Sequence, residues 1–217
     1  HVVSPFGARG GNGGIHDVDN LGWKLASIFN DNISDNILNT YNEERLEAAK
    51  ENIANSSRAT NFMTPKNKMA KVFRDQVLDL SVNNQFFRNI INSGRLSVPF
   101  KLSDLKLDNE YRDDPMLGSI YVDFPILDRK GNQLFLTDVI ANSYNLLSFS
   151  KIKIEFPFNL NIISVGKENN EDVDFLDFEG KGLERYRAGL NYLIRPDGYI
   201  VGIFEEINIS ALEKCML

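Results

Sequence analysis

The feature that most constrains this chain is a glycine-rich segment close to its first residue. Five glycines stand between Ser4 and Gly14, and apolar residues then follow at helical spacing from Ile15 through Val18 to Leu25. This pattern predicts a loop up to Gly14 that leads into a helix from Ile15. Amides at a helix start lack intrahelical partners and lie at the positive end of the helix dipole. Such a loop can hold an anionic or oxygen-rich ligand, because glycine lets a ligand approach the backbone.

The spacing of these glycines, taken alone, leaves two interpretations open. It matches neither the GxGxxG dinucleotide fingerprint nor the GxxxxGK[ST] phosphate loop. A tight connection into a helix would use glycine in the same way, and Arg9 can be a plain surface cation. Spacing therefore indicates a helix start without identifying a ligand.

The hydrophobic period changes near residue 104. Before it, the spacing favours three helices, with Pro65 as a break before the third, which fits the apolar stripe from Met69 to Ile91. After it, alternation and turn residues favour strands over 120–126, 146–149, 152–156, 160–165 and a hairpin of 192–195 with 199–201. Helices first and mixed strands later predict a chain of the α+β or α/β class with two domains, 1–103 and 104–217.

Residues Pro5–Leu25, which read PFGARGGNGGIHDVDNLGWKL, closely resemble the second flavin-binding motif of the para-hydroxybenzoate and phenol hydroxylase family. Tyr41–Arg45 resembles the continuation of that motif. The family consists of FAD-dependent aromatic hydroxylases, and the 3-(3-hydroxyphenyl)propionate hydroxylase branch is the most similar. The resemblance implies FAD as cofactor and NADH or NADPH as co-substrate. The cofactor-binding residues that it implies are Pro5, Phe6, Gly7, Gly10, Gly11, Asn12 and Gly13.

Within this resemblance, the amides of Gly11 and Asn12 would point at the pyrimidine-ring oxygen of the isoalloxazine. Reduced flavin carries negative charge there, and a helix amino end stabilises that charge. Asp17 is interpreted as structural, and Glu44 with Arg45 as a structural ion pair. The motif names no catalytic acid or base in this segment.

Three further side chains allow two roles each. His1 is either a catalytic base or, the interpretation that we favour, a remnant of the motif near the flavin phosphates. Phe73 and Phe87 could line a hydrophobic substrate wall, but core packing is the simpler role for both.

The second domain resembles the thioredoxin-like appendage of the phenol and hydroxyphenylpropionate hydroxylase branch. The resemblance rests on the segment Leu193–Ile200, which reads LIRPDGYI. A disulfide-exchanging site needs two vicinal thiols, and Cys215 is the single cysteine of the chain. The sequence thus predicts a thioredoxin-like domain without redox cysteines, with a structural role in packing or a subunit contact.

Composition narrows the remaining functions. The net charge of −6 offers no field for nucleic acid, and two histidines without metal-ligand spacing give little support to a metal site. No apolar run approaches the about 20 residues of a membrane span. We expect a cytoplasmic protein that can form a homodimer. Because the chain begins His1-Val2-Val3, we also expect that it was cut from a longer protein with an amino-terminal FAD-binding half.

Two hypotheses for function follow. In the first, the chain is part of a flavin-dependent monooxygenase that hydroxylates a phenolic substrate with NAD(P)H and O₂. In the second, it is a non-catalytic thioredoxin-like assembly module or gene fragment that does not bind FAD on its own. A thioredoxin-fold redox protein is a weaker third possibility, which the single cysteine opposes.

Overall fold

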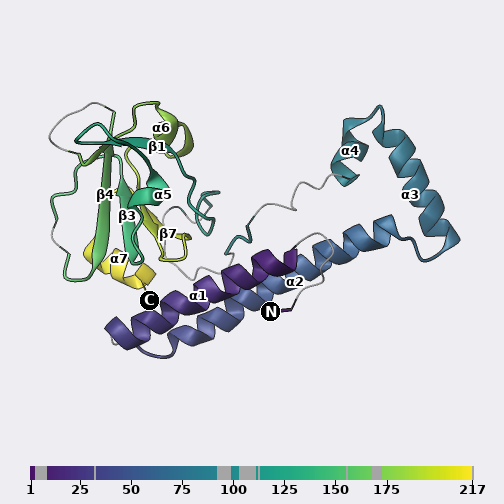
Figure 1. Ribbon diagram of the computed structural model, residues 1–217, viewed down its shortest axis with the longest axis horizontal. Helices are drawn as coiled ribbons and strands as arrows, with labels where there is room; N and C mark the ends of the chain where they lie inside the picture. The colour runs from purple at the N-terminus through teal and green to yellow at the C-terminus, as the bar shows by residue number, and fades with distance from the viewer. Residues whose placement is uncertain are drawn as a thin grey trace. The chain divides into compact units, whose positions relative to one another are not determined.

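The computed structural model describes residues 1–2, 9–31, 33–91, 99–102, 111, 113–154, 156–167 and 173–216. The chain divides into two compact units, His1–Phe100 and Lys101–Leu217 (Figure 1). The first unit is helical, and the second is built around a β-sheet.

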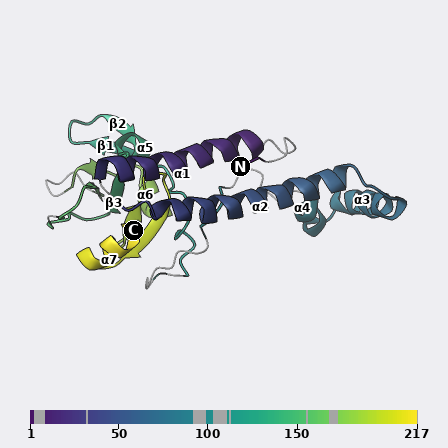
Figure 2. The same cartoon turned by 90° about the horizontal axis from the view of Figure 1, so that it is seen from below.

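Helices make up the described part of the first unit. They are α1 (Arg9–Asp31), α2 (Ile37–Met63), α3 (Lys68–Ser81) and α4 (Gln85–Ile91). α1 and α2 lie side by side (Figures 1 and 2), and α3 packs with α4. α2 ends at Met63, so the expected break at Pro65 is confirmed.

The glycine-rich segment is more helical than the sequence predicted. The expected loop up to Gly14 is wrong in extent, because α1 begins at Arg9 and includes Gly10, Gly11 and Gly13 in its first turns. Each glycine disfavours a helix by about 1 kcal/mol relative to alanine, and the prediction followed that penalty. Packing of α1 against α2 outweighs it, since helices in proteins draw most of their stability from tertiary contacts.

The predicted single helix from Met69 to Ile91 is two helices. At the start of the second one, the Asn84 side-chain oxygen accepts a hydrogen bond from the Phe86 amide at 2.9 Å. Asparagine favours such caps because its side chain replaces the missing intrahelical partner. The apolar period continues across this cap, and so it concealed the break.

A seven-stranded sheet forms the second unit, in the order β2-β1-β5-β4-β3-β6-β7. β3 and β4 are parallel, as are β4 and β5, and the other neighbours are antiparallel. The strands are β1 (Pro125–Asp128), β2 (Gln133–Phe135), β3 (Tyr144–Ser148), β4 (Leu160–Gly166), β5 (Phe175–Leu176), β6 (Asn191–Ile194) and β7 (Ile200–Phe204). The helices of this unit are α5 (Leu136–Val139), α6 (Lys181–Arg185) and α7 (Ile209–Met216).

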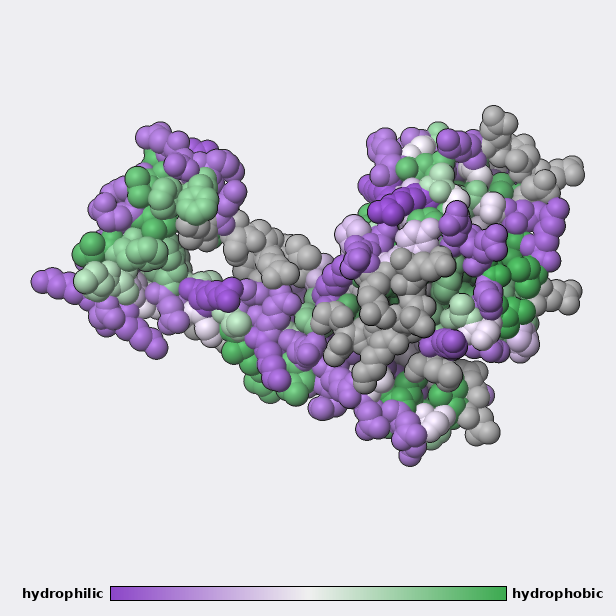
Figure 3. Space-filling model, turned by 180° about the vertical axis from the view of Figure 1, so that it is seen from behind, coloured by the Kyte–Doolittle hydropathy of each residue, from purple (hydrophilic) through white to green (hydrophobic). Residues whose placement is uncertain are grey.

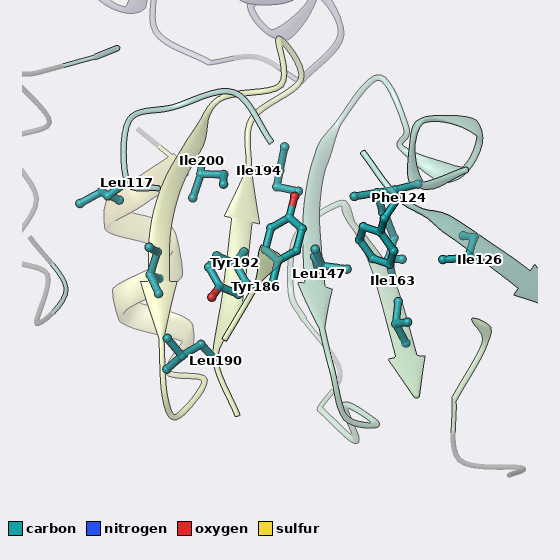
Figure 4. Packing of buried hydrophobic residues seen from close by; sticks show 13 residues of the cluster. Leu117, Phe124, Ile126, Leu147, Ile163, Tyr186, Leu190, Tyr192, Ile194 and Ile200 are labelled. Carbon is teal, nitrogen blue, oxygen red and sulfur yellow. The ribbon is translucent and has the colours of Figure 1, made fainter. Parts of the chain in front are cut away.

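An apolar cluster fills the second unit (Figure 4). Its aromatic part centres on Tyr186, whose ring centroid lies 5.7 Å from that of Phe124 and 5.0 Å from that of Tyr192. The Tyr186 hydroxyl donates to the Val122 carbonyl at 2.8 Å and accepts from the Val122 amide at 2.7 Å. Burial raises the pKa of Tyr186 well above its usual range, so this hydroxyl keeps its proton.

The predicted hairpin is confirmed as β6 and β7. The Gly198 amide donates to the Arg195 carbonyl at 2.9 Å, which closes the turn, and Gly198 has a φ of 83°. The Arg195 guanidinium binds both carboxylate oxygens of Asp197, at 2.8 and 2.7 Å, and lies 5.5 Å from the centroid of the Tyr199 ring. Every polar residue of the LIRPDGYI segment thus has a structural role in the turn.

Two other strand predictions need correction. The expected strand 120–126 is reduced to β1, and Ile120 forms only an isolated bridge with Tyr199. The backbone there bonds to the hairpin turn instead, with the Tyr121 amide donating to the Gly198 carbonyl at 3.0 Å. Of the expected strand 152–156, residues 152–154 and 156 are in no strand. The expected strands 146–149 and 160–165 are confirmed as β3 and β4.

Helices followed by a mixed sheet confirm the predicted α+β class. Among the described residues, we find no helix with the length and apolar character that a bilayer crossing requires.

Candidate functional site

The start of α1 holds the part of the predicted site that the structure describes. Gly10, Gly11, Asn12 and Gly13 lie in the first turns of this helix, whereas Pro5, Phe6 and Gly7 lie outside the described residues. The first turn of any α-helix carries amides without intrahelical acceptors. Gly11 and Asn12 are exposed, so a ligand can reach the backbone at these two positions.

The glycines of α1 are not explained by packing within the chain. A Cβ atom built on Gly11, Gly13 or Gly14 meets no atom within 4 Å, and none of the three has a positive φ. In the second unit, by contrast, a Cβ on Gly118 would lie 2.1 Å from the Leu102 carbonyl oxygen. Bare backbone in open space lets an external group approach Gly11 closely, although Gly22, farther along the same helix, is equally open.

Polar groups join α1 to α2 behind this helix start. The Arg45 Nε donates to Asp17 Oδ1 at 2.7 Å, and both residues are buried. Asn20 Nδ2 donates to Glu44 Oε2 at 2.7 Å, and Lys24 Nζ lies 3.2 Å from the same oxygen. Asp17, Asn20, Lys24, Glu44 and Arg45 are called the polar seam below.

The polar seam corrects one sequence interpretation and adds residues that it missed. The predicted ion pair between Glu44 and Arg45 is wrong. Glu44 pairs with Lys24 and Arg45 pairs with Asp17, and both partners lie on α1. Lys24 was not singled out, yet its side chain is 0% exposed and its Nζ donates to Asn20 Oδ1 at 2.8 Å. The signal was present in the helical spacing of Asp17, Asn20 and Lys24, which places three polar residues on one face.

His1 lies beside the polar seam. Its ring Nδ1 is 3.2 Å from Asp17 Oδ2, and its ring centroid is 6.0 Å from that of Tyr41. The carboxylate that could activate this imidazole is also bound by Arg45. The contacts therefore give His1 a place in the helix packing and leave its two predicted roles as hypotheses.

The opposite face of α1 is apolar and exposed. Ile15, Val18 and Phe29 are 69%, 73% and 81% exposed. Hydrophobic side chains also gather on the surface of the α3–α4 pair, as Figure 3 shows. Phe73 is exposed there, so the core-packing role predicted for it is wrong within this chain; Phe87 is partly buried and packs edge-on against Phe86, with ring centroids 5.4 Å apart.

In the part of the chain that the structure describes, two other kinds of site, a metal site and a reactive thiol, have little support. It contains no group of three or more His, Cys, Asp or Glu side chains that could hold a metal ion. Burial raises the pKa of the Cys215 thiol to about 11, so this thiol is protonated and a weak nucleophile at neutral pH.

Comparison with known families gives a match for the amino-terminal part of the chain. Residues 1–56, which include the glycine-rich segment, α1 and most of α2, match the model of the FAD-binding domain family. The family resemblance expected from Pro5–Leu25 is confirmed. FAD is the cofactor of the matched domain family.

Curated relatives extend this similarity beyond the motif. A 3-(3-hydroxyphenyl)propionate/3-hydroxycinnamic acid hydroxylase of Mycolicibacterium vanbaalenii is 26% identical over 152 residues, which are 69% of this chain and 27% of the relative. Tetracenomycin B2 monooxygenase-dioxygenase of Streptomyces olivaceus is 56% identical over 45 residues, or 21% of this chain and 8% of the relative. The chain thus spans about a quarter or less of the length of these relatives.

Solved structures share the fold. An aklavinone-11 hydroxylase, crystallised with FAD and aklavinone, superimposes with a TM-score of 0.67 over 99% of this chain and 42% of its own length, at 19% identity. An aromatic hydroxylase from angucycline biosynthesis gives a TM-score of 0.66 over 100% of this chain and 42% of its own, at 20% identity. At these identities the likeness concerns the fold.

Proposed function

We propose that this chain is part of a flavin-dependent monooxygenase that hydroxylates an aromatic, phenolic substrate with NADH or NADPH and O₂. The match of residues 1–56 to the FAD-binding domain family supports this proposal. The relatives with hydroxylase and monooxygenase names support this activity. The observation that carries the proposal is the start of α1. Its glycines open the backbone where no contact within the chain requires glycine.

The described residues at the start of α1 are of a kind that could hold the flavin ring. The amides of Gly11 and Asn12 would hold the oxygen-bearing edge of the isoalloxazine, and the dipole of the 23-residue α1 would favour negative charge there. Gly10 and Gly13 add no side chain to the start of α1, and Pro5, Phe6 and Gly7 belong to the same proposed site. Bound FAD would supply the redox chemistry, and the protein would orient it and exclude water.

The exposed apolar face of α1 is expected to bind another part of the whole protein. We assign it to an amino-terminal FAD-binding half of the whole protein, because Ile15, Val18 and Phe29 are large, exposed and on the face opposite the polar seam. Exposed apolar patches of this kind mark interaction sites. A cytoplasmic location and a homodimer remain parts of the same proposal.

The domain boundary that we propose lies at residues 103 and 104, with a thioredoxin-like second domain. The order β4-β3-β6-β7, with one parallel pair, an antiparallel hairpin and a closing α7, supports that assignment. Cys215 is the single cysteine, and the raised pKa of its thiol opposes redox chemistry. The role of this domain is structural.

Titration of the purified chain with FAD tests the proposal. We expect a flavin absorbance spectrum that shifts and gains structure on binding, either with the chain alone or after addition of the amino-terminal half of the Mycolicibacterium vanbaalenii relative. Gly11→Ala should weaken binding, because a methyl group then stands where the ring edge approaches. Gly22→Ala is the matched control, since Gly22 lies in the same helix and also has open space around it.

Two results would decide against this function. A chain that binds no FAD in either arm would favour the non-catalytic module. Equal affinity for the Gly11→Ala and Gly22→Ala variants would remove the start of α1 from the site.

A further inference from the structure

The polar seam occupies a position where two packed helices ordinarily bury apolar side chains. It contains two acidic and two basic side chains, buried Asp17 with Arg45 and partly buried Glu44 with buried Lys24, and Asn20 bonds to both members of the second pair. These four side-chain charges sum to zero, and the His1 amino group is a further partner of Asp17. Asp17 and Lys24 lie on α1 and have opposite signs, as do Glu44 and Arg45 on α2, so the pattern is specific to one alignment of the helices.

A buried ion pair contributes little net stability compared with apolar groups of the same size, and its best-attested use is to fix register. Sliding α1 by one turn, about 5.4 Å, would move Asp17 away from Arg45 toward Tyr41 or Ala49. Neither residue can pair with a carboxylate as an arginine does. The slide is therefore opposed by buried charges that lose their partners.

We propose that Asp17 and Arg45 are positioning residues for the flavin. Their ion pair sets the register of α1 on α2 and thereby the place of the Gly11 and Asn12 amides. Gly11 precedes Asp17 by about 9 Å along the rigid helix axis, so a shift at the ion pair moves the amides by the same amount. Contacts to a cofactor must be held within about 0.5 Å, so a slide of one helical turn, which the paired charges oppose, would remove them. This inference rests on the proposed function, which assigns those amides to FAD.

The test separates position from stability with three variants. Arg45→Met removes one partner, Arg45→Lys keeps the charge, and Asp17→Leu with Arg45→Met replaces the pair by apolar groups. The double variant is expected to stay folded, because apolar replacement of a buried pair is commonly neutral or stabilising. Arg58→Met is the matched control, an exposed arginine on the same α2.

The first measurement is the distance between spin labels on the otherwise unchanged chain. Labels are placed at Ile15→Cys on α1 and Ile53→Cys on α2, with Cys215→Ser, and distances are read by electron double resonance. We expect one narrow distance in the parent, Arg45→Lys and Arg58→Met proteins. The double variant should show a broad distribution or a second distance displaced by about one helical turn. A merely structural role would lower the unfolding midpoint and leave the distance unchanged.

The second measurement is FAD affinity, in whichever arm of the titration above shows binding. We expect a loss of tenfold or more for the double variant and little change for Arg58→Met. A single unshifted distance in the double variant overturns the positioning role whether or not FAD binds. A shifted distance with unchanged FAD affinity also overturns it. A parent that binds no FAD refutes the proposed function, and with it the flavin part of this inference, while the distances still report the register.

Discussion

The two units differ in the balance of apolar and polar side chains that they bury. The second unit encloses apolar residues such as Ile126, Leu147 and Ile163 (Figure 4), whereas the α1–α2 pair encloses the polar seam. The exposed side chains are reversed as well, since Ile15 and Phe29 of α1 face outward. The second unit thus satisfies its apolar surface within itself, and the first does not.

This difference indicates how each unit is stabilised. A sheet with a dry core is stabilised by its own burial. A helix pair with a polar inside and an apolar outside is stabilised fully only when another body covers the outside. The glycines differ in a related way. Gly131, Gly180 and Gly189 of the second unit have a positive φ, and Gly118 also has a close backbone neighbour, whereas Gly11 of α1 has neither constraint.

The largest expected effect comes from breaking the buried ion pair of the second unit. Arg195→Met leaves the Asp197 carboxylate buried without its guanidinium partner, which should lower the free energy of unfolding by about 3–5 kcal/mol. Urea denaturation followed by near-UV circular dichroism of the tyrosines, most of which lie in this unit, measures the loss. Trp23, the single tryptophan, reports on the first unit by fluorescence and should keep its transition.

Arg129→Met is the matched control for that experiment. Arg129 pairs with Asp174 at 3.0 Å, but both side chains are largely exposed, and such pairs contribute about 0–1 kcal/mol. Equal losses for the two arginines would contradict the contrast between buried and exposed pairs.

A somewhat smaller effect is expected from opening the apolar core. Leu147→Ala removes a fully buried side chain of β3, which should cost about 2–5 kcal/mol. In the first unit, Phe73→Ala removes an exposed ring and should change the free energy of unfolding by less than about 0.5 kcal/mol. The same two spectroscopic probes measure both variants. A large loss for Phe73→Ala would show that the helical unit has an apolar core after all.

Local chemistry made part of the fold predictable. The hairpin around Asp197 was predicted because proline and glycine restrict the backbone at neighbouring positions. The helical spacing of Ile15 and Val18 likewise gave the body of α1. These signals lie within a few residues of what they determine.

Long-range pairing made the rest unpredictable. Asp17 and Arg45 are 28 positions apart, so the ion pair follows from how two helices meet and from no short motif. The helical state of Gly11 depends on the same packing, against local propensity. Ile120 forms an isolated bridge with Tyr199 instead of the expected strand, and Tyr199 is too far along the chain for a local pattern to predict the pairing.

The glycines give the next prediction, in the second unit. Gly118→Ala should lower the free energy of unfolding by more than about 1 kcal/mol, because residue 118 has a φ of 78° and the added Cβ would meet the Leu102 carbonyl oxygen. Tyrosine circular dichroism should record the change, with the Trp23 transition unmoved. An unchanged unfolding midpoint would refute the requirement for glycine at this turn.

In α1 the same substitution should have the opposite sign. Gly11→Ala adds a methyl group in open space within a helix and should raise the free energy of unfolding of the first unit by about 0.5–1 kcal/mol. Trp23 fluorescence measures it, and Gly22→Ala should give a similar gain. A loss of stability at Gly11 would mean that the chain itself, and not a ligand, requires glycine there.

The smallest effect concerns an exposed turn that touches neither interior. A hydrogen bond from the Asn132 side chain, at 2.8 Å, is the main cause that holds the pKa of Asp128 below its usual value of 3.8. Because the folded pKa is lowered, the turn is stabilised above the unfolded pKa, and this contribution is lost as the pH falls through the folded pKa. Asp128→Asn should therefore flatten the acid side of the stability profile of the second unit slightly and leave the first unit unchanged. Carboxyl titration by nuclear magnetic resonance measures the Asp128 pKa directly, and a value at or above 3.8 would contradict the role of Asn132.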